Sequence, residues 1–237
     1  MKAPKSSFMK ISILTLFPEM FQGPFDYSII KNAKDKRKVE IDFVNIRDFG
    51  IGRHKVVDDK PYGGGIGMII RVDVLHKAIE SAKDKSASWR TKKQKIVLLG
   101  PRGKTFSQEK AREFSKLEHL MLVCGRYEGI DERAKKYIDE ELSIGDFVVT
   151  GGEIPAMLVT DAVVRLINGV LKEGVTTSES FSPLLEYPQY TKPSSYKNQD
   201  IPPILLSGDH GKIDSFRKRK SLQITSELRP DLLKSKG

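Results

Sequence analysis

The sequence has very few of the residues that build disulfide frameworks and metal clusters. Its 237 residues include one cysteine, Cys124, so a disulfide within one chain and a cysteine metal cluster are both excluded. The four histidines show no ligand spacing and indicate no metal site. The first apolar run, residues 11–17, ends at Pro18 and is too short to span a bilayer. We therefore expect a cytoplasmic protein without a membrane partner, and Met9 is an alternative start to Met1.

Two glycine signatures of nucleotide binding are also incomplete. A G-x-G-x-x-G fingerprint within residues 63–70 would need a glycine at 68 or 70, where Met68 and Ile70 stand. Residues 100–105 (GPRGKT) follow a predicted strand as a phosphate-binding loop does, but the glycine required five positions before Gly103 is Leu98. The sequence therefore disfavours nucleotide hydrolysis.

The chain does carry a large positive charge. Its formal net charge is +10, with 38% hydrophobic and 30% charged residues. This composition is typical of globular proteins, and the charge favours a polyanionic partner such as nucleic acid.

Apolar runs alternate with amphipathic segments, which indicates an α/β fold. Two turn-rich or polar segments, residues 47–68 and 83–94, interrupt the alternation. After Leu171 the composition changes to a flexible linker at 172–188 and then to a small, basic, helical module. The predicted strands are 11–17, 39–46, 95–99, 119–124 and 147–149, and the predicted helices are 21–33, 72–83, 107–117, one from about 132, and 154–167.

The most informative stretch is residues 124–157. Two predicted strands stop there at glycine turns, one at Gly125 and one at Gly151 and Gly152. Ligands of parallel α/β sheets bind beyond the carboxyl ends of the strands, and glycine lets bare backbone approach them. The pattern predicts a ligand site formed largely by backbone.

Residues 124–133 (CGRYEGIDER) and 143–157 (SIGDFVVTGGEIPAM) resemble the cofactor-binding core of the bacterial tRNA (guanine-N1)-methyltransferases of the TrmD type. These enzymes are members of the SPOUT class, and the resemblance extends over almost the whole chain from Met9. It implies an α/β parallel-sheet N-terminal domain with a trefoil knot (1–171), a linker carrying the general base (172–188), and a small helical tRNA-binding domain (189–237). It also implies a homodimer.

The resemblance further implies methylation of guanine N1, immediately 3′ of the anticodon in tRNA, with S-adenosyl-L-methionine. N1 carries a proton that a base must remove, and the charge that develops on O6 needs a cation. Glu179 falls where the family has its general base, and Arg165 matches the arginine that supports O6. The implied cofactor-binding residues are Leu99, Pro101, Gly125, Tyr127, Glu128, Gly129, Ile144, Gly145, Asp146, Phe147, Val148, Val149, Gly151, Gly152 and Pro155.

The sequence departs from the family pattern at several positions. Glu179 replaces an aspartate, Ile66 a proline, Gln189 a histidine and Phe147 a common tyrosine. Mg²⁺ is an expected aid to catalysis in the family, and the sequence gives no site for it. Two alternatives stay open: a related knotted RNA ribose 2′-O-methyltransferase, and a non-catalytic RNA-binding protein.

Overall fold

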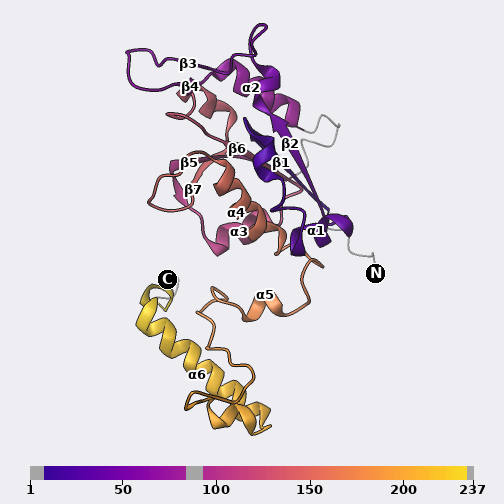
Figure 1. Cartoon of the computed structure of the whole chain (residues 1–237), viewed down its shortest axis with the longest axis vertical. Coiled ribbons are helices and arrows are strands. Elements are labelled where there is room, and N and C mark those ends of the chain that lie inside the picture. The colour runs from indigo at the N-terminus through magenta and orange to yellow at the C-terminus, as the bar shows by residue number, and fades with distance from the viewer. Residues whose placement is uncertain (1–7, 84–92, 234–237) are drawn as a thin grey trace. The chain divides into compact units, whose positions relative to one another are not determined.

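The computed structural model describes residues 8–83 and 93–233, in two compact units, Met1–Leu171 and Lys172–Gly237 (Figure 1). Most of the extension before Met9 and of the predicted polar linker at 83–94 lies outside the described residues. Each unit is described by itself.

The first unit is built on a five-stranded sheet in which every neighbouring pair is parallel. The strand order is β2-β1-β6-β5-β7. The strands are β1 (Met9–Thr15), β2 (Val39–Asn45), β5 (Gln94–Thr105), β6 (His119–Cys124) and β7 (Glu140–Ser143). Because both faces of a parallel sheet are covered, the central strands are near-continuous apolar runs, and every residue of β6 is buried.

Helices cover both faces of this sheet (Figure 1). Ile11 and Ile13 of β1 belong to one core cluster, whereas Leu14 belongs to the other, as the alternation of a strand requires. The first cluster includes residues of α1 (Ser28–Asp35), α3 (Gln108–Phe114), α4 (Glu153–Val164) and the 3-10 helix η1 (Pro18–Phe21). The second includes residues of α2 (Val72–Ala82), η2 (Ile46–Phe49) and η3 (Glu132–Tyr137).

Several predicted elements are confirmed and others are shorter. The helix predicted at 72–83 is α2, and Ser107 caps α3 by accepting a hydrogen bond from the Lys110 N–H. The helix predicted at 21–33 is α-helical only over α1, and the one predicted from about 132 is the 3-10 helix η3. The turn-rich segment before α2 contains one small antiparallel pair, β3 (Asp58–Asp59) with β4 (Ile69–Ile70).

The strand predicted at 147–149 is wrong. The edge strand is β7, which pairs with Val97–Leu99 of β5 and ends at Ser143. Gly145, with φ of +143°, then turns the chain away from the sheet, and Phe147 and Val148 are 58% and 91% exposed in a loop. The apolar run misled the prediction because a strand forms only where a neighbour offers its backbone for pairing.

Residues 100–105, predicted as a loop after a strand, instead continue β5. The register against β7 shifts between Leu99 and Lys104. A Cβ on Gly103 would lie 2.3 Å from the backbone carbon of Glu141, so only glycine permits this close approach to β7. The segment is thus a strand irregularity and not a phosphate-binding loop.

The connections around β7 bring distant segments together. The chain passes from β6 beyond β5 to reach β7, and then returns to the end of β6, where the Gly152 N–H donates to the Gly125 carbonyl at 2.8 Å. Two loops therefore meet at the carboxyl end of the sheet.

The second unit consists of short elements and one long helix. They are α5 (Val175–Ser178), β8 (Ser195–Tyr196), β9 (Gln199–Asp200), η4 (Pro203–Leu206), α6 (His210–Leu228) and η5 (Pro230–Leu232). The segment predicted as a flexible linker, 172–188, contains α5 and is anchored on α6, because the Leu185 N–H donates to Thr225 Oγ1 at 3.0 Å.

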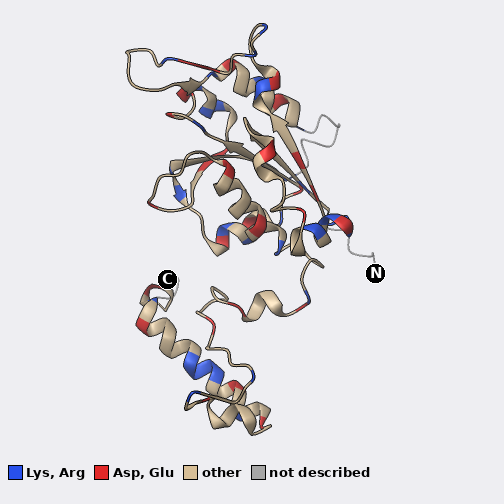
Figure 2. Ribbon diagram, in the orientation of Figure 1, with Lys and Arg blue, Asp and Glu red and all other residues tan. Residues whose placement is uncertain are grey.

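The charge and hydropathy of the helices indicate which partners the protein can have, a polyanion or a membrane. Lys and Arg gather in the middle of α6, at residues 217–220 (Figure 2). Within residues 8–83 and 93–233, no helix combines the length and apolar character needed to cross a bilayer.

Candidate active site

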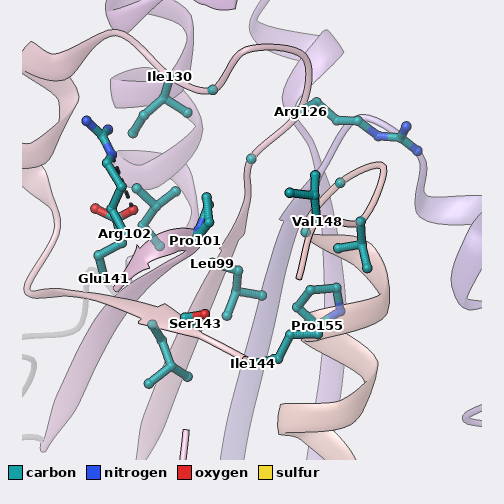
Figure 3. Close-up of a pocket in the computed structure, with 18 of the residues that line it drawn as sticks. Leu99, Pro101, Arg102, Arg126, Ile130, Glu141, Ser143, Ile144, Val148 and Pro155 are labelled. Carbon is teal, nitrogen blue, oxygen red and sulfur yellow. Dashed lines mark ion pairs between the residues drawn. The ribbon is translucent and has the colours of Figure 1, made fainter. Parts of the chain in front are cut away.

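A pocket of about 660 Å³ lies at the carboxyl ends of β5, β6 and β7 (Figure 3). Three segments form most of its wall, residues 98–102, 125–130 and 141–152, and Pro155 of α4 closes one side. Small-molecule sites usually have volumes of roughly 300–1,000 Å³, so this pocket has the size for one such ligand.

The structure brings the predicted cofactor-binding residues together around this pocket. All fifteen except Asp146 line it, and the neighbours of Asp146 on both sides, Gly145 and Phe147, do so. The lining combines glycine backbone with many apolar side chains, so side chains contribute more to the wall than the sequence-based expectation of a site formed largely by backbone.

The first loop, residues 125–130, begins where β6 stops at Cys124. Tyr127 has a φ of +58°, a left-handed conformation that costs of order 1 kcal/mol for a residue with a Cβ. Backbone hydrogen bonds from the turn-rich segment hold the loop in this conformation: Glu128 N–H donates to the Met68 carbonyl and Ile70 N–H to the Gly129 carbonyl, each at 3.0 Å. Strained residues held in this way are concentrated at functional sites.

The second loop, residues 144–152, is fixed at its start by Ser143. Its Oγ donates to the Gly145 carbonyl at 3.0 Å and accepts from the Gly145 N–H at 3.2 Å. A Cβ on Gly145 would lie 2.8 Å from the Phe147 ring, so the glycine lets the ring fold back over the turn. Val148 at the tip stays almost fully exposed.

Charged side chains form one side of the pocket. Arg102 lies 3.2 Å from Glu132 and 3.8 Å from Glu141. Arg102 and Glu141 are labelled in Figure 3. Lys135 lies 3.0 Å from Glu132 and 3.2 Å from Glu141. The hydrogen bond from Lys135 lowers the pKa of Glu132, and the bonds to Glu132 and then Glu141 raise the pKa of Lys135. Glu132 and Lys135 are therefore both ionised at neutral pH.

Some residues at the site were not singled out from the sequence. Arg102, Arg126, Ile130, Glu141 and Ser143 line the pocket as well, and Glu153 lies directly beside it, paired with Arg126. Only their position in the sequence could have indicated a role at the site, because each stands in or near a motif or the end of a predicted strand.

The cysteine and the serine beside the pocket are not placed to act as nucleophiles. Cys124, the residue before the first loop, is fully buried, and burial raises the pKa of its thiol well above the ordinary value. The Ser143 hydroxyl is engaged by Gly145. The arrangement is suited to binding and orienting a small molecule whose own chemistry supplies the reactive group.

The two predicted catalytic residues belong to different units. Arg165 is half-buried and caps the C-terminal end of α4 in the first unit. Glu179 is half-buried and caps the C-terminal end of α5 in the second unit. Among the residues that the structure describes, no group of three His, Cys, Asp or Glu side chains is arranged to hold a metal ion.

Comparison with known proteins gives one consistent result. A family model described as tRNA (Guanine-1)-methyltransferase TrmD matches residues 9–235. The chain is 52% identical over 232 residues to a tRNA (guanine-N(1)-)-methyltransferase of Carboxydothermus hydrogenoformans. The matched region covers 97% of this chain and 89% of that protein. Proteins with the same description from Clostridium beijerinckii and Bacillus pumilus are 53% and 48% identical, over 95% and 96% of this chain and 92% and 93% of their own lengths.

Proposed function

Because the chain belongs to the TrmD family and is a tRNA (guanine-N1)-methyltransferase, we propose that it methylates the guanine immediately 3′ of the anticodon, with S-adenosyl-L-methionine bound in the pocket described above. The observation that carries this proposal is the meeting of the two motif loops, 125–130 and 144–152, around one pocket. Nothing about the pocket suggests a second activity.

The pocket fits the proposed cofactor in size and chemistry. Its volume of about 660 Å³ suits a ligand of this size, and Leu99, Ile130 and Pro155 offer apolar surface. The bare backbone of Gly125 and Gly129 leaves room beside the wall, since a Cβ on Gly129 would meet nothing within 4 Å. When bound, S-adenosyl-L-methionine supplies an electrophilic methyl group, and the protein supplies position and proton transfer.

We assign the proton transfer to Glu179. Guanine N1 gains a free lone pair only when its proton leaves, so a carboxylate within hydrogen-bond reach must accept it. Glutamate keeps the carboxylate of the family's aspartate and adds one methylene. The half-buried Arg165 would stabilise the charge that develops on O6, because a guanidinium in a partly dry site interacts more strongly than one in water. We assign no step to Mg²⁺.

A homodimer is part of the proposal, and α4 supports it. The first turns of this helix expose apolar side chains: Ile154 is 50% exposed and Leu158 is 46% exposed. They follow the loop that exposes Phe147 and Val148, and the exposed residue of the next turn is Asp161. Exposed apolar residues gathered in this way are typical of association surfaces. A second copy of the chain would bury them beside the pocket.

The proposed knot of the SPOUT class is compatible with the strand order. The chain passes β5 twice near its carboxyl end, once on the way to β7 and once on the return to β6, and threading of one loop by the other would produce the knot.

The tRNA substrate supports the expected cytoplasmic location.

The basic run at residues 217–220 of α6 is assigned to phosphate contacts with tRNA (Figure 2). Phosphate contacts position the RNA without reading its sequence, and they make binding sensitive to salt. Selection of guanine would come from an unstacked base held beside the cofactor.

The test is transfer of labelled methyl from S-adenosyl-L-methionine to tRNA transcripts that carry guanine or adenine immediately 3′ of the anticodon. We expect label only in the guanine transcript, and nuclease mapping should find it on the base. Label on ribose would instead identify the 2′-O-methyltransferase alternative. Absence of both transfer and cofactor binding would leave the RNA-binding alternative.

Glu179→Gln tests the assigned base. It should bind cofactor as the wild type does but transfer methyl at least about a hundredfold more slowly, since general-base catalysis contributes roughly 10²–10⁴-fold. Glu179→Asp, which restores the family residue, is the matched control and should retain activity. Near-normal transfer by Glu179→Gln would exclude this residue as the base.

A further inference from the structure

Arg126 lines the pocket with its backbone, while its side chain points away from the other lining residues (Figure 3). The guanidinium makes three contacts in two other segments. Its Nη1 donates to the Thr150 carbonyl at 3.2 Å, its Nη2 lies 3.5 Å from the Met20 sulfur, and its Cζ lies 4.5 Å from the centre of the Phe17 ring. One side chain therefore connects the first pocket loop with the second loop and with the segment after β1.

The fourth contact of Arg126 is a buried carboxylate. Glu153, the first residue of α4, is 1% exposed, and its Oε2 lies 3.3 Å from Arg126 Nε. Its Oε1 accepts a hydrogen bond from the buried Thr15 hydroxyl at 2.9 Å, at the end of β1. A carboxylate at the first turn of a helix is favoured by the helix dipole, but a buried charge still needs an opposite charge beside it. Arg126 supplies that charge.

Gly151 explains why this pair matters for the loops. A Cβ on Gly151 would lie 2.5 Å from Glu153 Oε2 and 2.6 Å from Arg126 Nε. The ion pair therefore lies directly against the Gly151 backbone. The next residue, Gly152, donates its N–H to the Gly125 carbonyl. The two loops are therefore joined by this hydrogen bond and by the one from Arg126 to the Thr150 carbonyl.

We propose that Arg126 and Glu153 are positioning residues that clamp the two cofactor loops, 125–130 and 144–152, into the shape that binds S-adenosyl-L-methionine. This rests on the proposed function, and it assigns to Glu153 a role that acts entirely through Arg126 and the backbone. Without the pair, the second loop loses its fixed distance from the first, and part of the binding energy is spent on reordering it. Methyl transfer from the bound cofactor, which uses other residues, changes little.

The experiment compares Glu153→Gln, Arg126→Gln and the double variant with the wild type. Binding of S-adenosylhomocysteine is measured by calorimetry, the KM for S-adenosyl-L-methionine and kcat by methyl transfer, and folding by thermal unfolding. Each single variant should bind about tenfold or more weakly and show a raised cofactor KM with kcat reduced less than threefold. The double variant should bind no more weakly than the weaker single variant, because residues that act as a pair are not additive.

Two further variants keep the test decisive. Glu113→Gln makes the same change in a partly exposed ion pair with Lys110, away from the pocket, and should leave binding unchanged. Arg126→Lys keeps the charge near Glu153 but cannot also reach the Thr150 carbonyl as a fork does, and it replaces Arg126→Gln if that variant fails to fold.

The possible results separate the inference from the function on which it rests. If folded Glu153→Gln and Arg126→Lys bind S-adenosylhomocysteine within twofold of the wild type, the clamp is refuted, whatever happens to their melting temperatures. Independent, multiplying effects of the two single substitutions would also refute it. If the wild type itself does not bind S-adenosylhomocysteine, the proposed function fails first.

Discussion

Two glycine pairs of the first unit, residues 63–64 and 151–152, use glycine for different reasons. Gly63 and Gly64 have φ values of +88° and +79°, and a Cβ on either would meet nothing within 4 Å. Gly152 has an ordinary φ of −76°, yet a Cβ there would lie 2.6 Å from the Cys124 Cα. The first segment needs the backbone freedom of glycine, and the second needs its lack of a side chain.

The difference shows which segment determines the shape of the pocket. The open segment at 63–64 is surrounded by solvent, and neighbouring side chains do not restrict it there. The packed segment at 151–152 is held between the end of β6 and the Arg126–Glu153 pair. Substitutions should therefore affect stability and cofactor binding at 151–152, and mainly local loop conformation at 63–64.

The largest effect is expected from Gly152→Ala. Its Cβ would meet backbone of Cys124 and Gly125, which cannot rotate away, so we expect destabilisation of about 2 kcal/mol, within the usual range for overpacking. Urea unfolding gives this value, and calorimetry should show that S-adenosylhomocysteine binding is lost or strongly weakened. A stable variant with normal binding would remove the basis of the comparison.

Gly151→Ala should have a smaller effect of the same kind. Here the Cβ would meet the side-chain ends of Arg126 and Glu153, which can move at the expense of their ion pair. We expect roughly 1 kcal/mol of destabilisation, at the low end for overpacking. Cofactor affinity should fall by a similar factor in Gly151→Ala and in Glu153→Gln. A large loss in one and none in the other would argue against a shared cause.

Gly64→Ala should leave cofactor affinity within twofold of the wild type. The left-handed conformation costs a residue with a Cβ about 1 kcal/mol, and this exposed loop can relax locally. Gly64→Asn is the matched control, because asparagine tolerates positive φ better than alanine does. Unfolding measurements should rank wild type, Asn and Ala in that order. Reversal of Asn and Ala would show that contact, and not conformation, limits this position.

The smallest effect is expected from Glu113→Gln, which gives a baseline for both glycine segments. Hydrogen bonds from Lys110 and Lys95 lower the pKa of Glu113 from 4.5 to about 2. A lowered pKa means that the stabilisation is present above pH 4.5 and is lost as the pH falls towards 2. Because the Glu113 side chain is about half exposed, solvent screens the interaction, and we expect at most ~1 kcal/mol at pH 7. The difference in unfolding free energy between variant and wild type should shrink below pH 4.5 and disappear only below pH 2.

The sequence predicts much of this site but not all of it. The positions of β1, β2, β6 and the start of β5, the ends of β6 and α2, and the glycines that line the pocket all follow from apolar runs and from motif positions. Residues 147–149 did not, because an apolar, β-branched run reads the same in an edge strand and in a loop that covers a pocket. The Arg126–Glu153 pair joins residues from two separate motifs, and no period or spacing in the sequence encodes such a contact.

The continuation of β5 through residues 100–105 was missed for a related reason. Glycine and proline normally indicate a turn, but Gly103 lies where β7 approaches the backbone too closely for a Cβ. In both cases a tertiary contact, and not local propensity, decided the local structure.

The central claim is that the loops at 125–130 and 144–152 bind S-adenosyl-L-methionine. Hydrogen–deuterium exchange of the wild-type protein, with and without saturating S-adenosylhomocysteine, tests it most directly. We predict slower exchange in peptides covering residues 98–102, 125–130 and 144–152, and little change at residues 63–64. Protection confined to other parts of the chain, with none in these three segments, would contradict the account.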